Sequence, residues 1–555
     1  MIGNVYSQQF AVLSRLASLP CRVLALATLL LSACGFGAAV PPPVPPPTPV
    51  PIAAPAVPLH TAGPYIVDSN GYRVRLNAVN WYGAEGEDYV VLGLESEPLA
   101  TIVGEIKSRG FNAVRLPWSN EMYESNPVVG DYALTANVSL KGEHALNIFD
   151  AVVNALTGAG IMVILDNHVS TAMWCCNNDV NQLWYNSTYT QADWINDWKG
   201  MVNRYKSNAM VIGADLRNEP RISAVWGGGG SDDWHAAATT GGNAVLSQNP
   251  NLLIFVEGIN YAGNLSGVSS TPVTLSTANR LVYEVHDYGF WYSGLTSYSN
   301  WYNGIYSNWG YLVLGSNPQP VWIGEFGTCN TASTCVSSSS NSNLGYWFGF
   351  IHQFTSEYSV DWSYWAFNGT TEDGNGDGFG SAETYGIMNT SWNGDALSAL
   401  TANLESLETS GGGPAAGTYK ITNVNSDLVM EVSGTSKTAG TVVDQYSWNG
   451  GKNQEWTLTY LNNGLYTLTN VNSGLVLDVS GQSTSMGGKI DQYTSNGGSN
   501  QEFIVSQTAD GNYKIVNSNS GYAVEVPGSS TSGGVQLDQW GLNGGKNQEW
   551  TFTLE

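Results

Sequence analysis

Short apolar runs and amphipathic stretches alternate along the chain from residue 64 to about residue 408. The amphipathic stretches predict helices, among them 98–109, 143–158, 192–205 and 344–357. The apolar runs are rich in β-branched residues and predict strands at 74–80, 111–116, 161–166, 210–217, 252–257, 281–286, 321–325 and 361–366. Eight strands that alternate with helices predict an α/β fold, a (β/α)8 TIM barrel, whose active site belongs at the carboxyl ends of the strands.

A different pattern follows the Gly- and Pro-rich break at 409–416. Residues 417–555 contain short alternating strands and Gly-rich turns, and two signals recur there in three copies at equal spacing. The first signal is Asp444-Gln445-Tyr446, Asp491-Gln492-Tyr493 and Asp538-Gln539-Trp540, and the second is Asn453-Gln454-Glu455-Trp456, Asn500-Gln501-Glu502-Phe503 and Asn547-Gln548-Glu549-Trp550. This threefold repeat resembles a ricin B-type β-trefoil, an all-β fold in which the last aromatic of the second signal is expected to pack in a shared core.

The first residues are expected to be a targeting segment. Arginines precede the apolar run 23–31, which is too short to cross a bilayer, and the run ends in Leu31-Ser32-Ala33-Cys34-Gly35, which resembles a bacterial lipobox. We therefore expect 1–34 to be a signal peptide and Cys34 to be lipidated. The alternative is ordinary cleavage and a freely secreted product. Residues 35–63 are Pro-rich and predict an extended tether that precedes the barrel domain at 64–408.

The charge balance limits the class of partner. Lys+Arg 20 against Asp+Glu 45 gives a net charge of −25, which argues against nucleic acid and anionic lipid. Contact with a membrane is expected only through a lipid anchor. The chain has Trp 20 and Tyr 29, and flat rings suit the apolar faces of sugars, although core packing is the simpler interpretation of any single ring. We expect a polysaccharide partner and a monomeric protein.

Four cysteines follow the signal peptide, namely Cys175, Cys176, Cys329 and Cys335. In an oxidising compartment they allow three disulfide pairings, between which the sequence does not choose. A structural zinc site is the alternative, but paired C-x-x-C units and nearby histidine ligands are missing from their spacing. We expect disulfides that hold loops at the barrel rim.

Two glutamates each close an apolar run. Glu219 stands in Asp215-Leu216-Arg217-Asn218-Glu219-Pro220, and Glu325 stands in Val321-Trp322-Ile323-Gly324-Glu325-Phe326-Gly327. If both runs are barrel strands, the two carboxyl groups meet at one rim. Hydrolysis of an acetal uses one carboxylic acid to protonate the leaving oxygen and one carboxylate to attack or to activate water. The pair therefore predicts a glycosidase.

Further motifs at strand ends narrow this class. They are Asn80-Trp81, Val114-Arg115-Leu116-Pro117, Asn218-Glu219-Pro220, Asn279-Arg280-Leu281-Val282-Tyr283 and Gly324-Glu325-Phe326-Gly327. In this order the motifs resemble family 5 glycoside hydrolases, which are retaining enzymes, and within them the endo-β-1,4-glucanases. The resemblance implies that Glu219 is the acid/base and that Glu325 is the nucleophile. It also implies substrate-binding or supporting roles for Arg115, His168, Asn218, His286, Tyr288 and Trp365.

The chemistry of each glutamate agrees with these roles. A nucleophile must be ionised, so Arg115 and the Tyr288 hydroxyl are expected to donate to Glu325, whereas the acid needs a raised pKa. Asn218 is expected to bind the sugar 2-hydroxyl. His168 and His286 are expected to complete the subsite, and Trp365 to stack beneath the reacting ring.

The C-terminal repeats also carry candidate sugar sites. The resemblance implies that each site uses a carboxylate, an exposed aromatic and an asparagine from one repeat. The matching positions are Glu431, Tyr446 and Asn453; Asp478, Tyr493 and Asn500; and Glu525, Trp540 and Asn547. Only the middle repeat has the family's usual Asp as its first member, so we expect this repeat to bind. The alternative for each repeat is a purely structural role.

No cofactor is expected, because an acid, a nucleophile and oriented donors are sufficient for the reaction. Residues 372–378 resemble a calcium loop, but Thr384 stands where the pattern over 373–384 requires Glu. A solvated Gly-rich loop is therefore the expectation, and no metal site.

The sequence predicts an exported enzyme that cleaves internal β-1,4-glucosidic bonds of cellulose or related β-glucans with retention, aided by a carbohydrate-binding domain. One alternative is another family 5 specificity, such as a mannanase, a xylanase or a β-1,3-glucanase. The alternative of another class is a non-catalytic surface protein that binds polysaccharide.

Overall fold

The computed structural model describes residues 55–69, 74–176, 180–315, 317–337, 342–372, 378–409, 414, 417–461, 465–507 and 512–555. The signal segment with Cys34, most of the predicted tether and linker, and the calcium-like residues 373–377 lie outside these ranges. Within them, no helix is both long enough and apolar enough to span a membrane.

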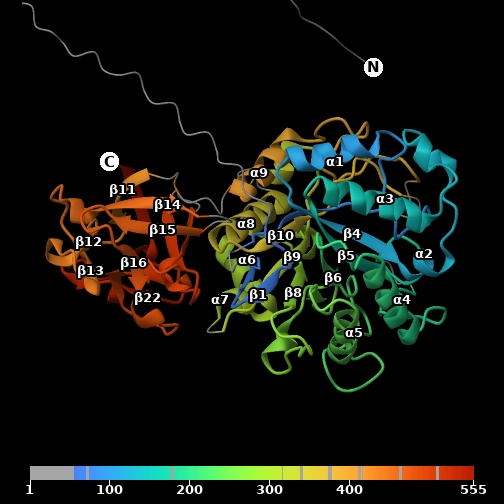
Figure 1. The fold of residues 1–555 in the computed structure, drawn as a ribbon. Helices are drawn as coiled ribbons and strands as arrows, with labels where there is room; N and C mark the ends of the chain where they lie inside the picture. Colours follow the sequence, from blue (N-terminus) through green and yellow to red (C-terminus); the bar gives the residue numbers. More distant parts are fainter. Residues whose placement is uncertain are drawn as a thin grey trace, which may run out of the picture. The chain divides into compact units, whose positions relative to one another are not determined.

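Eight parallel strands close into a barrel in the first domain (Figure 1). They are β3 (Asn77–Asn80), β4 (Ala113–Ser119), β5 (Met162–Val169), β6 (Val211–Asp215), β7 (Leu253–Glu257), β8 (Leu281–His286), β9 (Val321–Phe326) and β10 (Asp361–Tyr364). Each strand falls on one of the predicted strands, and β10 pairs with β3 to close the barrel. The prediction of a TIM barrel is therefore confirmed.

Alternation along the strands sorts their side chains into two layers. One set packs outward against the helices, and the other packs inward in a separate apolar cluster that includes Ala113, Ile164, Phe255, Val282 and Trp322. Because both faces of a barrel strand are covered, the strands are almost continuously buried.

Two positions further along the strands, the inward residues become polar. They are Arg115 on β4, Asp166 on β5, Asp215 on β6, Glu257 on β7 and Glu284 on β8, and all are buried. A polar layer therefore lies directly above the apolar interior, towards the carboxyl ends of the strands.

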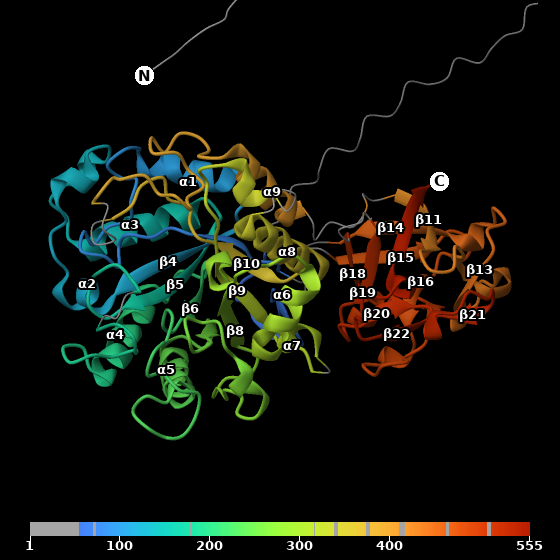
Figure 2. The ribbon, with the colours of Figure 1, turned by 180° about the vertical axis from the view of Figure 1, so that it is seen from behind.

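Helices form the outer layer of the barrel, as Figure 2 shows from behind. They are α1 (Leu99–Ser108), α2 (Asn120–Ser125), α3 (Ala145–Gly158), α4 (Gln191–Arg204), α5 (Trp234–Gln248), α6 (Tyr298–Ile305), α7 (Tyr311–Leu314), α8 (Asn343–Glu357) and α9 (Ser398–Thr409). In α1 the buried residues Ile102, Val103 and Ile106 form one stripe. A capping box of Thr190 and Asp193 begins α4. The four predicted helices agree with α1, α3, α4 and α8.

A short hairpin lies at the predicted boundary between tether and barrel. Strand β1 (His60–Ala62) pairs with β2 (Tyr65–Val67), and Leu59 is buried in the same cluster as the barrel interior. The prolines before residue 59 hid this short hairpin, because Pro-rich composition predicts an extended chain without pairing.

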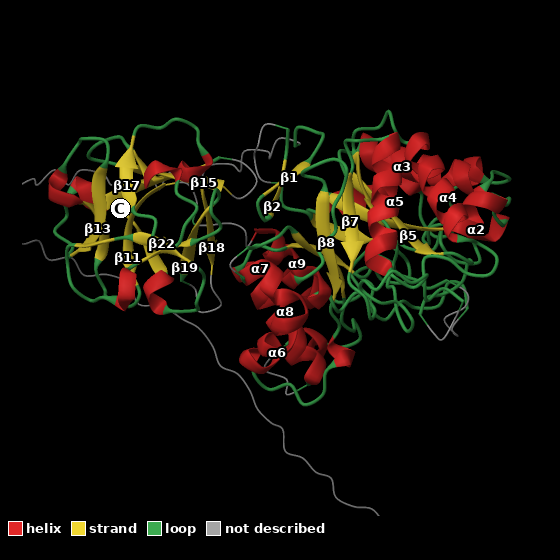
Figure 3. Ribbon diagram, turned by 90° about the horizontal axis from the view of Figure 1, so that it is seen from below, coloured by secondary structure: helices red, strands yellow, loops and turns green. Residues whose placement is uncertain are grey.

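The C-terminal domain consists of strands joined by short helical turns, and the contrast with the helix-rich barrel is clear in Figure 3. The strands are β11 (Gly417–Asn423), β12 (Val429–Val432), β13 (Thr441–Tyr446), β14 (Glu455–Tyr460), β15 (Leu465–Asn470), β16 (Val476–Val479), β17 (Ile490–Tyr493), β18 (Phe503–Gln507), β19 (Tyr513–Asn517), β20 (Ala523–Glu525), β21 (Val535–Gln536), β22 (Asp538–Trp540) and β23 (Trp550–Leu554). Their repeated, connected pairing agrees with the predicted β-trefoil.

The repeated aromatic residues lie in one core, as predicted. Trp456, Phe503 and Trp550 are fully buried in a single cluster. The Trp456 indole donates to the Met430 carbonyl at 3.0 Å, and the Trp550 indole donates to the Val524 carbonyl at 3.2 Å. The second sequence signal therefore marks the positions that hold the three repeats together.

The glutamine of the first sequence signal also has a structural role. The side chain of Gln445 donates to the Ser530 and Ser532 carbonyls, and the side chain of Gln492 donates to the Ser436 and Thr438 carbonyls. Gln539 makes the corresponding bonds to Ser483 and Ser485. Each buried glutamine thus fixes a loop of another repeat.

Candidate active site

A cavity of about 480 Å³ opens at the carboxyl ends of the barrel strands. Six residues predicted from sequence line it, namely His168, Asn218, Glu219, Tyr288, Glu325 and Trp365. The other two predicted barrel residues, Arg115 and His286, are fully buried and bond to those lining residues. The structure therefore brings all eight together.

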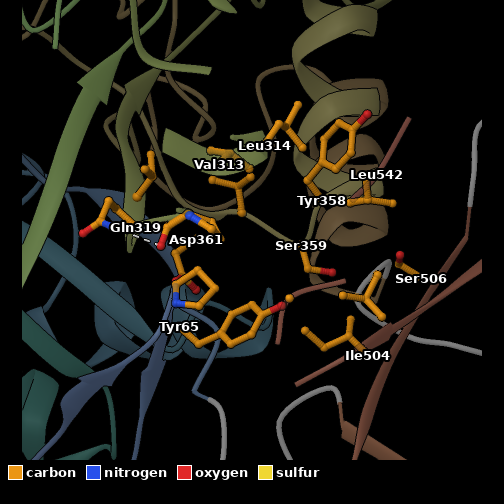
Figure 4. Close-up of a pocket in the computed structure, with 16 residues that line it drawn as sticks. Tyr65, Val313, Leu314, Gln319, Tyr358, Ser359, Asp361, Ile504, Ser506 and Leu542 are labelled. Carbon is orange, nitrogen blue, oxygen red and sulfur yellow. Dashed lines mark hydrogen bonds between the residues drawn. The ribbon is translucent and has the colours of Figure 1, made fainter. Parts of the chain in front are cut away.

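A second cavity, of about 50 Å³, lies near the opposite ends of the strands. Val321, the first residue of β9, and Asp361, the first residue of β10, line it, and Figure 4 shows Tyr358, Ser359 and Asp361 there. It contains none of the predicted catalytic residues. The larger cavity is therefore the candidate active site.

Glu325, near the end of β9, is held by donors to both carboxylate oxygens. Arg115 Nη1 lies 2.7 Å from Oε1, and the Tyr288 hydroxyl donates to Oε2 at 2.8 Å. These are the two donors that the sequence predicted for this residue. Such bonds fix the direction of the carboxylate.

Glu219 follows β6 and is nine-tenths buried, with 6 % of its surface exposed. Its Oε1 lies 3.0 Å from Nδ1 of His286, whose Nδ1 is also 3.5 Å from Oε2 of Glu325. Single side-chain atoms of Glu219, His286 and Glu325 all lie within 4.8 Å of one another. The two glutamate carboxyl groups therefore face each other across a short gap.

Arg115 is the centre of the polar layer. Among the described residues, five carboxyl groups approach its guanidinium within 2.7 to 3.6 Å, those of Asp166, Asp215, Glu257, Glu284 and Glu325. Burial alone would lower the pKa of Arg115, but these charges, with that of Asp166 the largest, raise it well above its usual value. The arginine is therefore a permanent cation beneath the cavity.

A single cation does not balance all of these carboxyl groups as anions. Burial raises the pKa of Asp166 and of Asp215 to about 7, although Arg115 opposes the shift. Burial together with neighbouring carboxylates raises the pKa of Glu257 and of Glu284 well above the usual value for glutamate. Burial therefore disfavours the charged form of these four groups, whereas Glu325 has both Arg115 and the Tyr288 hydroxyl as donors.

His168 and Asn218 form a second chain of contacts. His168 Nδ1 lies 2.6 Å from Asp166 Oδ2, and its Nε2 lies 3.2 Å from Asn218 Nδ2, while Asn218 Oδ1 accepts from Arg115 at 3.0 Å. Burial lowers the pKa of His168 and of His286 to about 3. Both imidazoles are therefore neutral at neutral pH and act through hydrogen bonds.

Aromatic side chains form much of the cavity wall. Trp365 stacks on Tyr82 with 4.9 Å between ring centroids and on His168 with 5.5 Å. Phe290 and Trp291, which follow Tyr288, are exposed by 60 % and 39 %. Rings that keep a free face beside a cavity are suited to contact with the apolar faces of sugar rings.

The structure pairs Cys175 with Cys176 and Cys329 with Cys335 as disulfides. This is one of the three pairings that the sequence allowed. Cys175 and Cys176 line the cavity, and Cys176 Sγ lies 2.9 Å from Oε2 of Glu219. The Cys175–Cys176 disulfide is therefore part of the cavity wall.

The three candidate sites of the C-terminal domain have the same arrangement. The aromatic residue is about half exposed in each, at 48 % for Tyr446, 46 % for Tyr493 and 43 % for Trp540. In the middle repeat Asn500 and Gln501 donate to Asp478 Oδ2 at 2.8 and 2.7 Å, and the asparagines and glutamines of the outer repeats donate to Glu431 and Glu525 in the same way. The preference for the middle repeat therefore rests only on its Asp.

Sequence reasoning missed part of the site. It gave no role to Asp215, Glu257 and Glu284, although they are inward-facing residues at or near strand ends, where the strand pattern could have found them. It also missed Glu85, Trp174, Tyr261 and Glu383, which lie in loops of the cavity wall and carry no periodic signal.

A closed parallel barrel with two facing glutamates at its carboxyl rim, one of them bound to a buried arginine, is typical of a glycoside hydrolase. Comparison with protein families agrees with this class, since residues 67–371 match the family described as cellulase, glycosyl hydrolase family 5. The chain belongs to this family. Residues 406–493, 452–540 and 499–555 match the ricin-type β-trefoil lectin domain-like family.

Individual relatives cover the barrel. An endoglucanase of Paenibacillus polymyxa is 36% identical over 339 residues, which are 57% of this chain and 81% of that protein. The major extracellular endoglucanase of Xanthomonas campestris pv. campestris is 36% identical over 237 residues, 40% of this chain and 48% of that protein.

Solved structures show the same extent of similarity. An endocellulase from the archaeon Pyrococcus horikoshii superposes with a TM-score of 0.55 and 28% identity, covering 63% of this chain and 98% of that chain. The catalytic domain of the Xanthomonas endoglucanase gives a TM-score of 0.55 and 28% identity. This match covers 63% of this chain and 99% of that chain.

Proposed function

We propose that this chain is a retaining endoglucanase that hydrolyses internal β-1,4-glucosidic bonds of cellulose or related β-glucans. The observation that carries the proposal is the placement of Glu219 and Glu325, which have side-chain oxygens within 4.8 Å of one another. Retaining glycosidases hold their carboxyl groups roughly 5 Å apart, whereas inverting enzymes need roughly 6.5 Å or more to admit a water molecule. Family membership and the endoglucanases among the relatives support the choice of substrate.

In the proposed reaction, Glu325 attacks the anomeric carbon while Glu219 donates a proton to the glycosidic oxygen. The leaving chain departs, and a covalent glycosyl-enzyme remains on Glu325. Glu219 then takes a proton from water, which attacks from the face that the leaving group has vacated. Two inversions at one carbon give net retention.

The residues around the two glutamates have supporting roles in this proposal. Arg115 and Tyr288 aim the Glu325 carboxylate, because each donates to one of its oxygens. His286 holds Glu219, and Asn218 is fixed by Arg115 and His168 so that it can reach the sugar 2-hydroxyl. Trp365 offers a ring to the sugar in the cavity. No step requires a metal or an organic cofactor.

The C-terminal domain is proposed to bind polysaccharide and to raise its local concentration at the barrel. The exposed ring, the buried carboxylate and the asparagine of each repeat support this role. The proposed domain boundaries are 64–408 for the hydrolase, 409–416 for the linker and 417–555 for the binding domain, with the β1–β2 hairpin added to the hydrolase.

Export of the protein is also proposed. The apolar run at 23–31 and the extracellular endoglucanase among the relatives support it. The motif around Cys34 favours a lipid anchor over free secretion, and the chain is proposed to act as a monomer.

A reducing-sugar assay on a panel of polysaccharides tests the activity. Carboxymethyl cellulose and mixed-linkage β-glucan should be cleaved with a rapid fall in viscosity, because cuts at internal bonds shorten the chains early. Mannan, xylan and β-1,3-glucan should be cleaved slowly. Faster cleavage of one of these three would assign another family 5 specificity, and no cleavage of any polymer would leave a non-catalytic binding protein.

The same panel tests the binding domain. Deletion of residues 409–555 should lower activity on insoluble cellulose by about 10-fold or more and leave activity on soluble oligosaccharides nearly constant, because linked modules gain avidity only on a polymer surface. In a pull-down on insoluble glucan, xylan and galactan, Asp478→Ala should weaken retention more than Asp427→Ala, which changes an exposed surface carboxylate. Equal activity of the truncated and full chains, with no retention on any polymer, would show a structural domain.

A further inference from the structure

The backbone of Glu219 has an unusual conformation. Its φ is 48°, in the left-handed region that residues with a side chain rarely adopt. Such a conformation persists only where the surroundings hold it, and it is frequent at functional sites. The direction of the Glu219 side chain depends on this conformation.

Two buried side chains hold the peptide groups on either side of this residue. The N–H of Glu219 donates to Oε2 of Glu257 at 2.6 Å, and its carbonyl oxygen accepts from Nη1 of Arg221 at 3.0 Å. Glu257 is the last residue of β7 and is fully buried, as is Arg221. The bond to Glu257 is the shorter of the two. It holds the N–H of Glu219, and φ is the rotation about the bond from this nitrogen to the Cα atom.

The second oxygen of Glu257 binds the arginine that holds the nucleophile. Oε1 accepts from Arg115 Nη2 at 3.0 Å, and Arg115 Nη1 lies 2.7 Å from Glu325. A single carboxyl group thus joins the main chain of Glu219 to the side chain that aims Glu325. No other residue of the polar layer described above bonds to the main chain of Glu219 in the part of the chain that the structure describes.

We propose that Glu257 is a positioning residue of the reaction, which fixes the left-handed backbone of Glu219 and so aims the acid/base carboxyl at the leaving oxygen. This inference rests on the proposed role of Glu219. Its physical basis is the sensitivity of proton transfer to geometry, since a displacement of about 1 Å costs about 10²-fold in rate.

Glu284 provides a matched control. It lies directly opposite Glu257 in the register of β7 and β8, is equally buried, and approaches Arg115 Nε at 3.6 Å. Within the described residues it has no hydrogen bond to Glu219. Replacement of Glu284 by glutamine therefore perturbs the same polar layer without releasing the backbone of the acid/base.

The experiment compares Glu257→Gln with Glu284→Gln on two aryl β-cellobiosides. Glutamine keeps the shape of Glu257, but its single acceptor oxygen cannot serve both Arg115 and the Glu219 N–H. Dinitrophenolate leaves without a proton, whereas phenolate needs one from Glu219. For Glu257→Gln, kcat/KM should fall by about 10²-fold with the phenyl glycoside and by less than about threefold with the dinitrophenyl glycoside.

Equal losses on both glycosides in Glu257→Gln would overturn the inference, because Glu257 would then act only through Arg115 or on folding. Glu284→Gln should lower kcat/KM for the two glycosides by the same factor. If thermal unfolding shows that Glu257→Gln is not folded, Glu257→Asp takes its place, since the shorter side chain cannot reach both partners. The test is then the loss of kcat/KM on the phenyl glycoside relative to the loss on the dinitrophenyl glycoside.

Glu219→Gln on the same two glycosides separates this inference from the proposed function. If Glu219→Gln shows no dependence on the leaving group, the assignment of the acid/base fails. If Glu219→Gln shows the dependence and Glu257→Gln does not, only the positioning role fails.

Discussion

Replacement of Glu325 by glutamine is expected to lower kcat on soluble β-glucan by at least about 10⁴-fold, the order of loss when a residue that forms a covalent intermediate is removed. The amide is not a nucleophile, and the contacts of Arg115 and Tyr288 with it cannot restore one. The protein should remain folded, because glutamine has the same shape and can still accept a bond from Arg115. Purified variant and wild type are compared by reducing-sugar release, with thermal unfolding as the check on folding.

Glu85→Gln serves as the control for this variant. Glu85 lines the same cavity and is buried, but it accepts its hydrogen bond from the main chain of Gly83 and has none to Glu325. Its replacement should cost far less than that of Glu325. Activity of Glu325→Gln on polysaccharide within about tenfold of wild type would refute the assignment, because the loss of a nucleophile costs far more than that.

Glu219→Gln is expected to give the second largest loss, and the loss should depend on the leaving group. On β-glucan, kcat/KM should fall by about 10³-fold, within the range of general acid catalysis. With the dinitrophenyl glycoside the glycosyl-enzyme should still form, and its hydrolysis should become slow because no base activates water. Added azide, which needs no base, should restore turnover.

The readout for Glu219→Gln is the rate of dinitrophenolate release with and without azide, together with the identity of the sugar product. A β-glycosyl azide should accumulate in the variant and not in Glu325→Gln. Azide that leaves the rate of Glu219→Gln unchanged, or a loss of the same size on both kinds of substrate, would place the acid/base elsewhere.

The barrel strands were predictable because burial on both faces leaves a strong signal. The runs 161–165 and 252–256, which make up most of two predicted strands, are apolar throughout, and this pattern distinguishes them from the amphipathic helices between them. The β1–β2 hairpin was not predictable, because three-residue strands next to prolines have too few positions for a period.

The candidate site was predictable where a polar residue follows an apolar run. Glu219, Glu325 and His286 were found in this way. Glu257 was not, although it stands two positions after the inward-facing Phe255, where alternation predicts that it faces the same interior. A charged residue in a strand is normally expected to face solvent, because buried carboxylates are rare unless they are paired. The partner of Glu257, Arg115, is distant in the sequence and could not be identified from it.

The loops of the cavity wall lie beyond sequence reasoning. The Tyr82 hydroxyl donates to Glu383, although 301 positions separate the two residues in the sequence, and Trp365 stacks on Tyr82. The left-handed φ of Glu219 is likewise a product of tertiary contacts with Glu257 and Arg221. Local propensity predicts neither these loop contacts nor the backbone conformation of Glu219.

Double displacement at two facing glutamates determines the anomeric form of the first product. Hydrolysis of a soluble cello-oligosaccharide by the wild-type protein is followed by proton NMR from the first moments of the reaction, before mutarotation mixes the anomers. The β-anomer should appear first, and the α-anomer should follow only by mutarotation. Initial release of the α-anomer would contradict double displacement, because a single displacement by water inverts the anomeric carbon of a β-glucoside.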